Sequence, residues 1–255
     1  MSSLRLEQVT KRFGGVEAVS DVSIDVEAGT ITGLIGPNGA GKTTVVNLVT
    51  GLLAPTSGTI LFNGSDITTV TAERRARAGI ARTFQNIRLL AQASVIENIA
   101  IGFHRHERAS LAAHLLGLPS SRRETRQYRE MARDLLGRFG MGRFALHPAG
   151  ALSYGDQRRV EIIRALAVRP QVLLLDEPVA GMNDVEAGAL GEVFAELTKD
   201  GIALLLIEHN IRFMKRICHR MHVLNSGRMI ASGSPDAVVN DPTVISAYLG
   251  TSWNA

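Results

Sequence analysis

Two spacings of apolar residues divide the chain into strand-rich and helix-rich parts. Residues 23–27 alternate polar and apolar side chains, and residues 59–64 form a short apolar run that ends in Asn-Gly. Such segments are typical of strands closed by turns. A third apolar run, 30–35, leads into a glycine-rich turn, and residues 45–49 then continue without a breaker as far as Gly51. This part of the chain therefore predicts strands, one of which is followed by a loop and a helix.

The middle of the chain has helical spacing instead. Residues 95–103 and 122–139 are predicted to be helices, the second because its apolar side chains recur near helical spacing. Residues 172–175 and 203–207 are unbroken apolar runs, which are typical of parallel strands covered on both faces. Residues 225–227, Asn-Ser-Gly, predict a hairpin turn. The simplest architecture is an α/β core built from both ends of the chain, with a helical subdomain inserted between them.

Composition narrows the class of protein and locates its charge. The 255 residues suffice for one large domain or a domain with an insertion, and no apolar run approaches the roughly 18 residues of a membrane span. The net charge of +4 is uneven, because residues 104–143 hold nine arginines and four acidic residues. Such a stretch can face nucleic acid or a membrane, or form the solvated face of a helix. The solvated face is favoured, since its main helix offers only Tyr128 for stacking on bases.

A phosphate-binding motif follows the third apolar run, with the spacing G-x-x-x-x-G-K-[ST] between a predicted strand and helix. Glycines let successive backbone N–H groups turn toward phosphate oxygens, and the helix points its positive end at the same charge. Lys42 is expected to reach the β- and γ-phosphates, and the Thr43 hydroxyl to bind Mg²⁺. The residues predicted to hold a nucleoside triphosphate are Gly36, Pro37, Asn38, Gly39, Ala40, Gly41, Lys42, Thr43 and Thr44.

Two carboxylates stand at the end of a predicted buried strand. Asp176 and Glu177 follow the apolar run 172–175 directly. Asp176 is expected to lie near Mg²⁺, and Glu177 is the candidate general base for an attacking water. Hydrolysis of the nucleotide is therefore favoured over transfer of a phosphoryl group to a bound acceptor.

Four further features carry a family resemblance. The segment 152–159, Leu-Ser-Tyr-Gly-Asp-Gln-Arg-Arg, resembles the signature motif of ABC-type ATPases. Gln85 resembles the glutamine of their Q-loop, His209 their switch histidine, and Phe13 their adenine-stacking aromatic residue. All occur in the order of that family, and the resemblance covers essentially the whole chain.

The resemblance implies a site shared between two subunits. ATPase domains of this family close head to tail, and the signature helix of one faces the γ-phosphate held by the other. Nucleotide contacts across the dimer are thereby implied for Ser153, Tyr154, Gly155 and Asp156. Catalytic roles are implied for Glu177, His209 and Gln85. Metal binding is implied for Thr43, Gln85 and Asp176.

The resemblance also implies a fold and partners. Residues 1–90 and 158–255 are expected to form a RecA-like α/β P-loop core with an N-terminal antiparallel β-subdomain, and residues 91–157 an inserted helical subdomain, within one ATPase domain. The expected cofactors are ATP and Mg²⁺. Expected partners are transmembrane permease subunits, a second ABC ATPase subunit and, indirectly, an external solute-binding protein, but no nucleic acid. The chain would lie on the cytoplasmic face of the inner membrane.

Within the family, four features indicate which kind of transporter the chain resembles. Tyr154 and the segments 82–89, 180–183 and 241–250 are similar to the larger ATPase subunit of bacterial branched-chain amino acid importers. ATPases for urea or amide import and for lipopolysaccharide export share much of this pattern and remain alternatives, as does a soluble ABC ATPase acting on nucleic acid. Asp156 departs from the usual Gln or Glu of the signature motif, and Asn183 lacks the usual D-loop carboxylate.

Overall fold

The computed structural model describes residues 2–83, 87–103 and 118–248, which fall into two compact units. The first unit is Met1–Arg82 with Gln171–Ala255, and the second is Thr83–Pro170. The second unit contains the segment expected as an insertion, 91–157, and extends beyond it over residues 83–90 and 158–170, which were expected in the core. Gln85 and residues 104–117 of the basic stretch lie outside the described residues.

An antiparallel sheet opens the first unit, with the strand order β2-β1-β4-β5. Its strands are β1 (Ser2–Phe13), β2 (Val16–Glu27), β4 (Ser57–Phe62) and β5 (Ser65–Asp66). Leu6 of β1 stands opposite Ile24 of β2 and Ile60 of β4, and all three side chains are buried. The alternating pattern of residues 23–27 thus puts one face of β2 into the core, which confirms the predicted strand.

The second sheet is mixed, with the strand order β10-β9-β3-β8-β7-β6. In that order its strands are Arg228–Gly233, Arg220–Asn225, Ile31–Ile35, Ala203–Ile207, Val172–Asp176 and Ile80–Arg82. All neighbours are parallel except β9 and β10, which a two-residue turn joins through Ser226 (φ 48°) and Gly227 (φ 79°). Every residue of β3, β7 and β8 is buried, so the prediction of parallel strands covered on both faces is confirmed.

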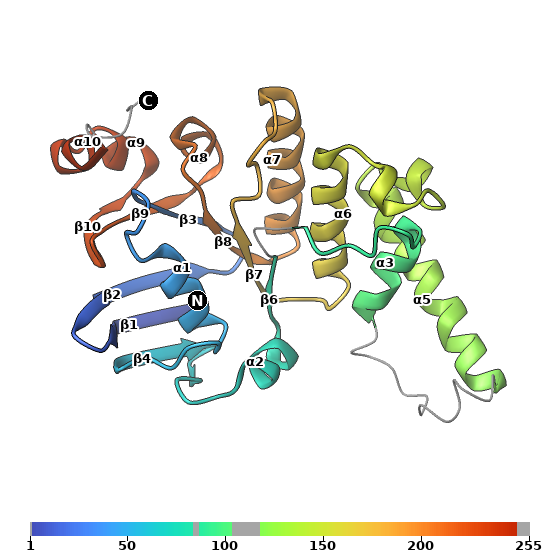
Figure 1. The fold of residues 1–255 in the computed structure, drawn as a ribbon, viewed down its shortest axis with the longest axis horizontal. Coiled ribbons are helices and arrows are strands. Elements are labelled where there is room, and N and C mark those ends of the chain that lie inside the picture. Colours follow the sequence, from blue (N-terminus) through green and yellow to red (C-terminus); the bar gives the residue numbers. More distant parts are fainter. Residues whose placement is uncertain (1, 84–86, 104–117, 249–255) are drawn as a thin grey trace. The chain divides into compact units, whose positions relative to one another are not determined.

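Helices and the first sheet cover opposite faces of the second sheet. Helices α7 (Asp184–Lys199) and α8 (Ile211–Ile217) pack on β8 and β3, while β2 contacts the same two strands (Figure 1). Helix α1 (Lys42–Val49) follows β3, and its buried valines and leucine belong to the core that joins the two sheets. The first unit is completed by α2 (Ala72–Ala78), α9 (Pro235–Val239) and α10 (Pro242–Tyr248).

The second unit is helical, as predicted for this part of the chain. Helix α3 (Val95–Gly102) packs against α5 (Pro119–Arg138) and α6 (Tyr154–Leu166), and two 3₁₀ turns, Gly142–Phe144 and Ala149–Ala151, lie between α5 and α6 along the chain. A Cβ on Gly102 would lie 2.6 Å from the Arg164 carbonyl oxygen, so α3 approaches α6 closely because this residue is glycine.

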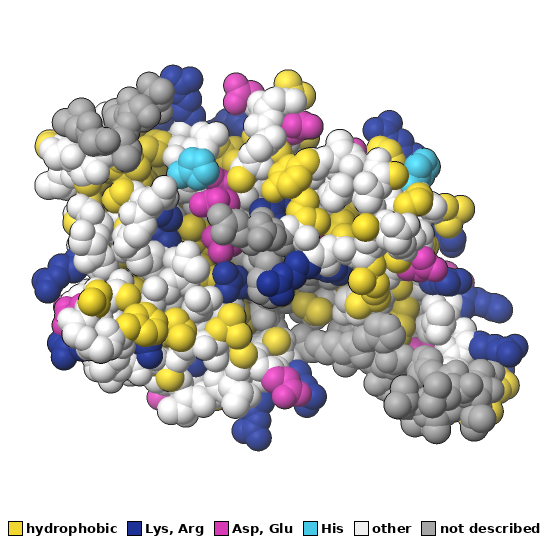
Figure 2. Space-filling view, viewed as in Figure 1, with side chains coloured by type: hydrophobic (Ala, Val, Ile, Leu, Met, Phe, Trp, Pro, Cys, Tyr) yellow, Lys and Arg dark blue, Asp and Glu magenta, His cyan; other side chains and the backbone are white. Residues whose placement is uncertain are grey.

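Helix α5 contains much of the basic stretch and has one buried face and one exposed face. Its buried residues are Ser121, Tyr128, Ala132 and Leu136, at the spacing of one helix face. The arginines of this helix are exposed, and Lys and Arg side chains appear over it in the space-filling view (Figure 2). The described part of the basic stretch therefore forms an exposed, charged helix face, and its role as a solvated face stays a prediction. Among the described helices, none is long and apolar enough to cross a membrane.

Candidate active site

The phosphate-binding loop connects β3 to α1 and depends on glycine at two positions. Gly36 has φ 152° and Gly41 has φ 102°. A Cβ would lie 2.1 Å from the Leu224 carbonyl oxygen at Gly36, and 2.5 Å from the Ala18 carbonyl oxygen at Gly41. Both contacts are far inside van der Waals distance, so a larger residue would displace the loop. No side chain caps the amino end of α1, which leaves its first N–H groups available to an anion.

Lys42 lies between the phosphate-binding loop and the two carboxylates at the end of β7. Its Nζ donates to the carbonyl oxygens of Gly36 at 2.7 Å and Pro37 at 3.0 Å. Burial lowers the pKa of Lys42, while the carboxylates of Glu177 and Asp176 act in the opposite direction. The structure therefore brings the predicted lysine and both predicted carboxylates together at one edge of the second sheet.

Asp176 ends β7, and an arginine from the neighbouring strand holds its side chain. Arg82 of β6 donates through Nη2 to Asp176 Oδ2 at 3.0 Å and through Nη1 to Asn47 Oδ1 of α1 at 2.7 Å. The Arg82 and Asp176 side chains are only 12% and 9% exposed. Arg82 was not among the predicted site residues, because nothing in its local sequence indicates that a parallel edge strand places it beside Asp176.

Glu177 and His209 follow the adjacent strands β7 and β8. The N–H of Glu177 donates to the Ile207 carbonyl oxygen at 2.8 Å, and its backbone is left-handed, with φ 48°. His209 Nδ1 lies 3.8 Å from Glu177 Oε1, with the imidazole 62% exposed and Glu177 23% exposed. A histidine and a carboxylate predicted from separate motifs thus lie side by side and open to solvent.

Glu208, between Ile207 and His209, is a second residue that sequence reasoning missed. It is fully buried, and burial raises the pKa of its carboxyl group, while N–H groups of the surrounding backbone lower it. Its position directly after an apolar strand was visible, but that position does not distinguish a buried glutamate from an exposed one.

Phe13 lies at the end of β1 with 48% of its surface exposed, and Lys11 Nζ stands 5.1 Å from its ring centroid. The ring is accessible for stacking, and it already accepts a cation on one face.

The signature segment lies in the second unit at the start of α6. Ser153 is the N-cap, and its hydroxyl accepts from the Asp156 N–H at 3.2 Å and donates to Asp156 Oδ2 at 3.1 Å. An acid in the first turn also suits the helix dipole. Tyr154, one position further on, is 47% exposed. The unusual Asp156 therefore completes the cap of the signature helix.

Asn183 has a comparable role in the first unit. Its Oδ1 accepts from the N–H groups of Val185 and Glu186, both at 3.0 Å, and Glu186 accepts in return from the Asn183 N–H. This capping box starts α7, and Asn ranks with Asp among the best N-cap residues. The missing D-loop carboxylate is thus compatible with an intact helix start.

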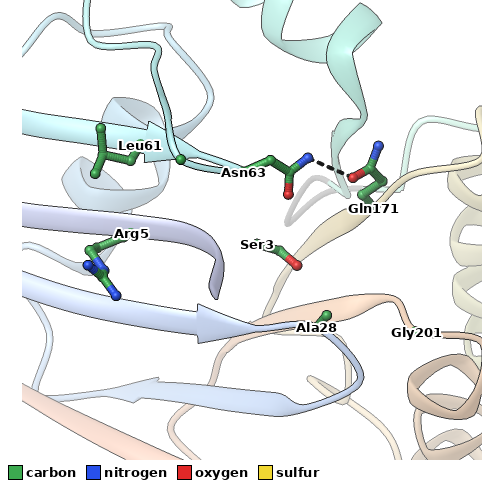
Figure 3. Close-up of a pocket in the computed structure, with 8 residues that line it drawn as sticks. Ser3, Arg5, Ala28, Leu61, Asn63, Gln171 and Gly201 are labelled. Atoms are coloured by element: carbon green, nitrogen blue, oxygen red, sulfur yellow. Dashed lines mark hydrogen bonds between the residues drawn. The ribbon is translucent and has the colours of Figure 1, made fainter. Parts of the chain in front are cut away.

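A cavity of about 600 Å³ lies elsewhere in the first unit (Figure 3). Ser3, Asn63, Gln171 and Gly201 are among its lining residues, and Asn63 donates to Gln171 at 2.8 Å. Gln171 and Gly201 precede β7 and β8, so this cavity lies at the amino ends of the parallel strands, whereas the phosphate loop follows the carboxyl end of β3. It is separate from the candidate active site.

Comparisons with known proteins agree with this geometry. Residues 19–180 match a family model described as ABC transporter, and residues 228–253 match one described as branched-chain amino acid ATP-binding cassette transporter. The high-affinity branched-chain amino acid transport ATP-binding proteins BraF of Pseudomonas aeruginosa and LivG of Escherichia coli are 41% and 42% identical to this chain, over 97% of it and 97% of their own lengths.

Among solved structures, a nucleotide-free ATP-binding cassette from an ABC transporter superposes with a TM-score of 0.84 at 32% identity, covering 98% of this chain and 100% of that one. The predicted α/β fold of the ABC-type ATPases is therefore confirmed. The phosphate loop, the paired carboxylates and these matches together show that the chain belongs to the ATP-binding ATPase family of ABC transporters.

Proposed function

We propose that this chain is the ATP-hydrolysing subunit of an importer for branched-chain amino acids. The observation that carries the ATPase part is the meeting of Lys42, Asp176 and Glu177 at the carboxyl edge of the parallel strands, directly beside a loop whose N–H groups can take phosphate. The substrate class rests on relatives named for branched-chain amino acid transport and on the match of residues 228–253.

Mg²⁺ would accompany the nucleotide. Thr43 presents an exposed hydroxyl in the first turn of α1, and Asp176 presents a carboxylate that Arg82 already orients. Hydroxyl and carboxylate oxygens are hard donors of the kind that Mg²⁺ prefers, together with phosphate oxygens. The residues proposed to hold the ion are Thr43 and Asp176, with Gln85 as a further ligand. When bound, the ion would neutralise charge on the phosphates.

Glu177 would act as general base, taking a proton from the water that attacks the γ-phosphate. His209, 3.8 Å from Glu177, would contact the γ-phosphate from the neighbouring strand end. Lys42 would leave the carbonyl oxygens of Gly36 and Pro37 and donate to phosphate oxygens instead. Phosphoryl transfer needs mainly positioning and charge stabilisation, and these residues can supply both.

The remaining donors would come from a second subunit. The amino end of α6, with Ser153 and the exposed Tyr154, would face the γ-phosphate held by the partner, where the helix dipole favours negative charge. The active unit would thus be a dimer of ATPase subunits bound to transmembrane permease subunits on the cytoplasmic side of the membrane. An external solute-binding protein would deliver the amino acid, and the ATPase itself would not contact it.

The substrate assignment is tested by uptake in cells that carry wild-type protein, the Lys42→Ala variant or no protein. Radiolabelled leucine and urea are supplied in parallel, with expression checked by immunoblot. Leucine uptake lost in the variant and in the deletion, with urea uptake unchanged, is the expected result. Loss of urea uptake with normal leucine uptake would assign the chain to amide import instead.

Co-purification from detergent-solubilised membranes tests the partners. The expected result is a complex with permease subunits and one further ATPase. Recovery with proteins of the lipopolysaccharide export machinery, or with nucleic acid, would contradict the proposal.

A further inference from the structure

A single buried carboxylate connects the two loops that carry Glu177 and His209. Glu208 Oε1 accepts from the Val179 N–H at 2.9 Å, two residues after Glu177. Glu208 Oε2 accepts from the N–H of His209 at 3.1 Å. The Glu208 side chain is fully buried, so these contacts are shielded from water. A buried carboxyl oxygen that accepts from a backbone N–H makes a contact that is costly to lose, because the unpaired donor would stay buried.

The backbone of Glu177 shows why this connection matters. A left-handed backbone, here φ 48°, is uncommon for a residue other than glycine and persists only where the surroundings hold it. The N–H of Glu177 is fixed on the Ile207 carbonyl oxygen at 2.8 Å, on one side of the strained residue. On the other side, the Val179 N–H is fixed on Glu208. The two hydrogen bonds hold the chain before and after Glu177, and both lead to the end of β8.

The same carboxylate also acts on the histidine. Glu208 Oε2 lies 3.8 Å from His209 Nδ1, the distance that also separates this nitrogen from Glu177 Oε1. The imidazole is exposed, whereas the His209 backbone is held by Glu208. The direction in which the histidine leaves the strand is therefore set by a residue that lies out of contact with solvent.

We propose that Glu208 is a positioning residue for ATP hydrolysis, which holds Glu177 and His209 in register by accepting hydrogen bonds from both loops. This inference rests on the proposed function of Glu177 and His209. Glu208 itself does not touch nucleotide, because Val179 and His209 occupy its oxygens and the surrounding core covers it.

The test is the Glu208→Gln substitution in the full chain. The amide has nearly the shape of the carboxylate, but its NH₂ group cannot accept from either backbone N–H, so one loop is released. ATP affinity is measured with a fluorescent ATP analogue, and kcat and KM from phosphate release across a range of protein concentrations. Glu97→Gln is the matched control, because Glu97 also accepts a backbone N–H, from Ser94 at 3.0 Å, but caps α3 in the second unit. Thermal unfolding of each variant gives the folded fraction.

The expected result is a kcat about 10- to 100-fold lower in Glu208→Gln, with KM and ATP affinity within about threefold of wild type. Glu97→Gln keeps the wild-type kcat. Loss of activity that merely follows the folded fraction, or a kcat within about twofold of wild type, would overturn the positioning role while leaving the proposed function intact. Failure of the wild-type chain to bind the ATP analogue would overturn both.

Discussion

Replacing His222 with leucine should remove much of the acid sensitivity of the first unit. His222 lies in β9 opposite Leu34, only 3% exposed, and neither ring nitrogen has a hydrogen-bond partner within the described part of the chain. Burial lowers the pKa of His222 from its ordinary value of 6.5 to about 4, with help from Arg220 and against the opposing effect of Asp25. The unfolded chain therefore binds this proton more tightly. The free energy of unfolding is therefore highest above about pH 6.5 and decreases as the pH falls toward 4. The decrease is about 3 kcal/mol, because each unit of difference in pKa corresponds to about 1.36 kcal/mol.

Urea unfolding at several pH values between 7 and 4 measures this loss. Wild type should lose about 3 kcal/mol more free energy of unfolding over that range than His222→Leu. Leucine is apolar and of similar size, so the variant should also be at least as stable as wild type at pH 7. The exposed His147 supplies the control, and His147→Gln should follow wild type. The same dependence on pH in wild type and His222→Leu would show that His222 does not cause the acid sensitivity.

Three further predictions concern the active site. Arg82→Ala should lower the free energy of unfolding by about 3 kcal/mol in urea, because it leaves the buried Asp176 carboxylate without its arginine partner. Adding Asp176→Asn should restore much of this loss. If the losses of the two single variants simply add in the double variant, the two side chains are not coupled. Asp156→Gln should strengthen ATP-dependent dimerisation several-fold in sedimentation experiments, because it removes about 1 kcal/mol of repulsion between the carboxylate and the γ-phosphate. An unchanged dimerisation constant would count against the proposal that the amino end of α6 faces the γ-phosphate held by the partner. Lys42→Ala should weaken ATP binding about tenfold or more in calorimetry, and wild-type affinity would refute the loop assignment.

Parts of the fold that depend on local sequence could be predicted. The runs 172–175 and 203–207 are apolar throughout because both faces of their strands are covered. An unbroken apolar run therefore predicts a strand that is buried on both faces. The phosphate loop was predictable for a related reason. Positions 36 and 41 require glycine because of their positive φ angles and the close approach of neighbouring carbonyl oxygens. The sequence shows these glycines at the spacing of the motif.

Contacts between distant residues could not be predicted in the same way. Arg82 and Asp176 are 94 positions apart and meet only because β6 pairs with β7. Glu208 looks like any acidic residue after a strand, and its burial depends on how the loop from Glu177 to Val179 folds over it. The capping roles of Asp156 and Asn183 depend on where α6 and α7 begin, which the motif comparison alone did not decide.

The Glu177→Gln substitution tests whether Glu177 is the general base of an ATPase. The amide keeps the size of the side chain but cannot accept a proton from water at neutral pH. Steady-state phosphate release and ATP-dependent dimerisation are measured on the same preparation. We predict unchanged ATP binding, a dimer that persists in ATP, and a kcat lower by about 100-fold or more. Near-normal hydrolysis by Glu177→Gln would show that Glu177 is not the general base.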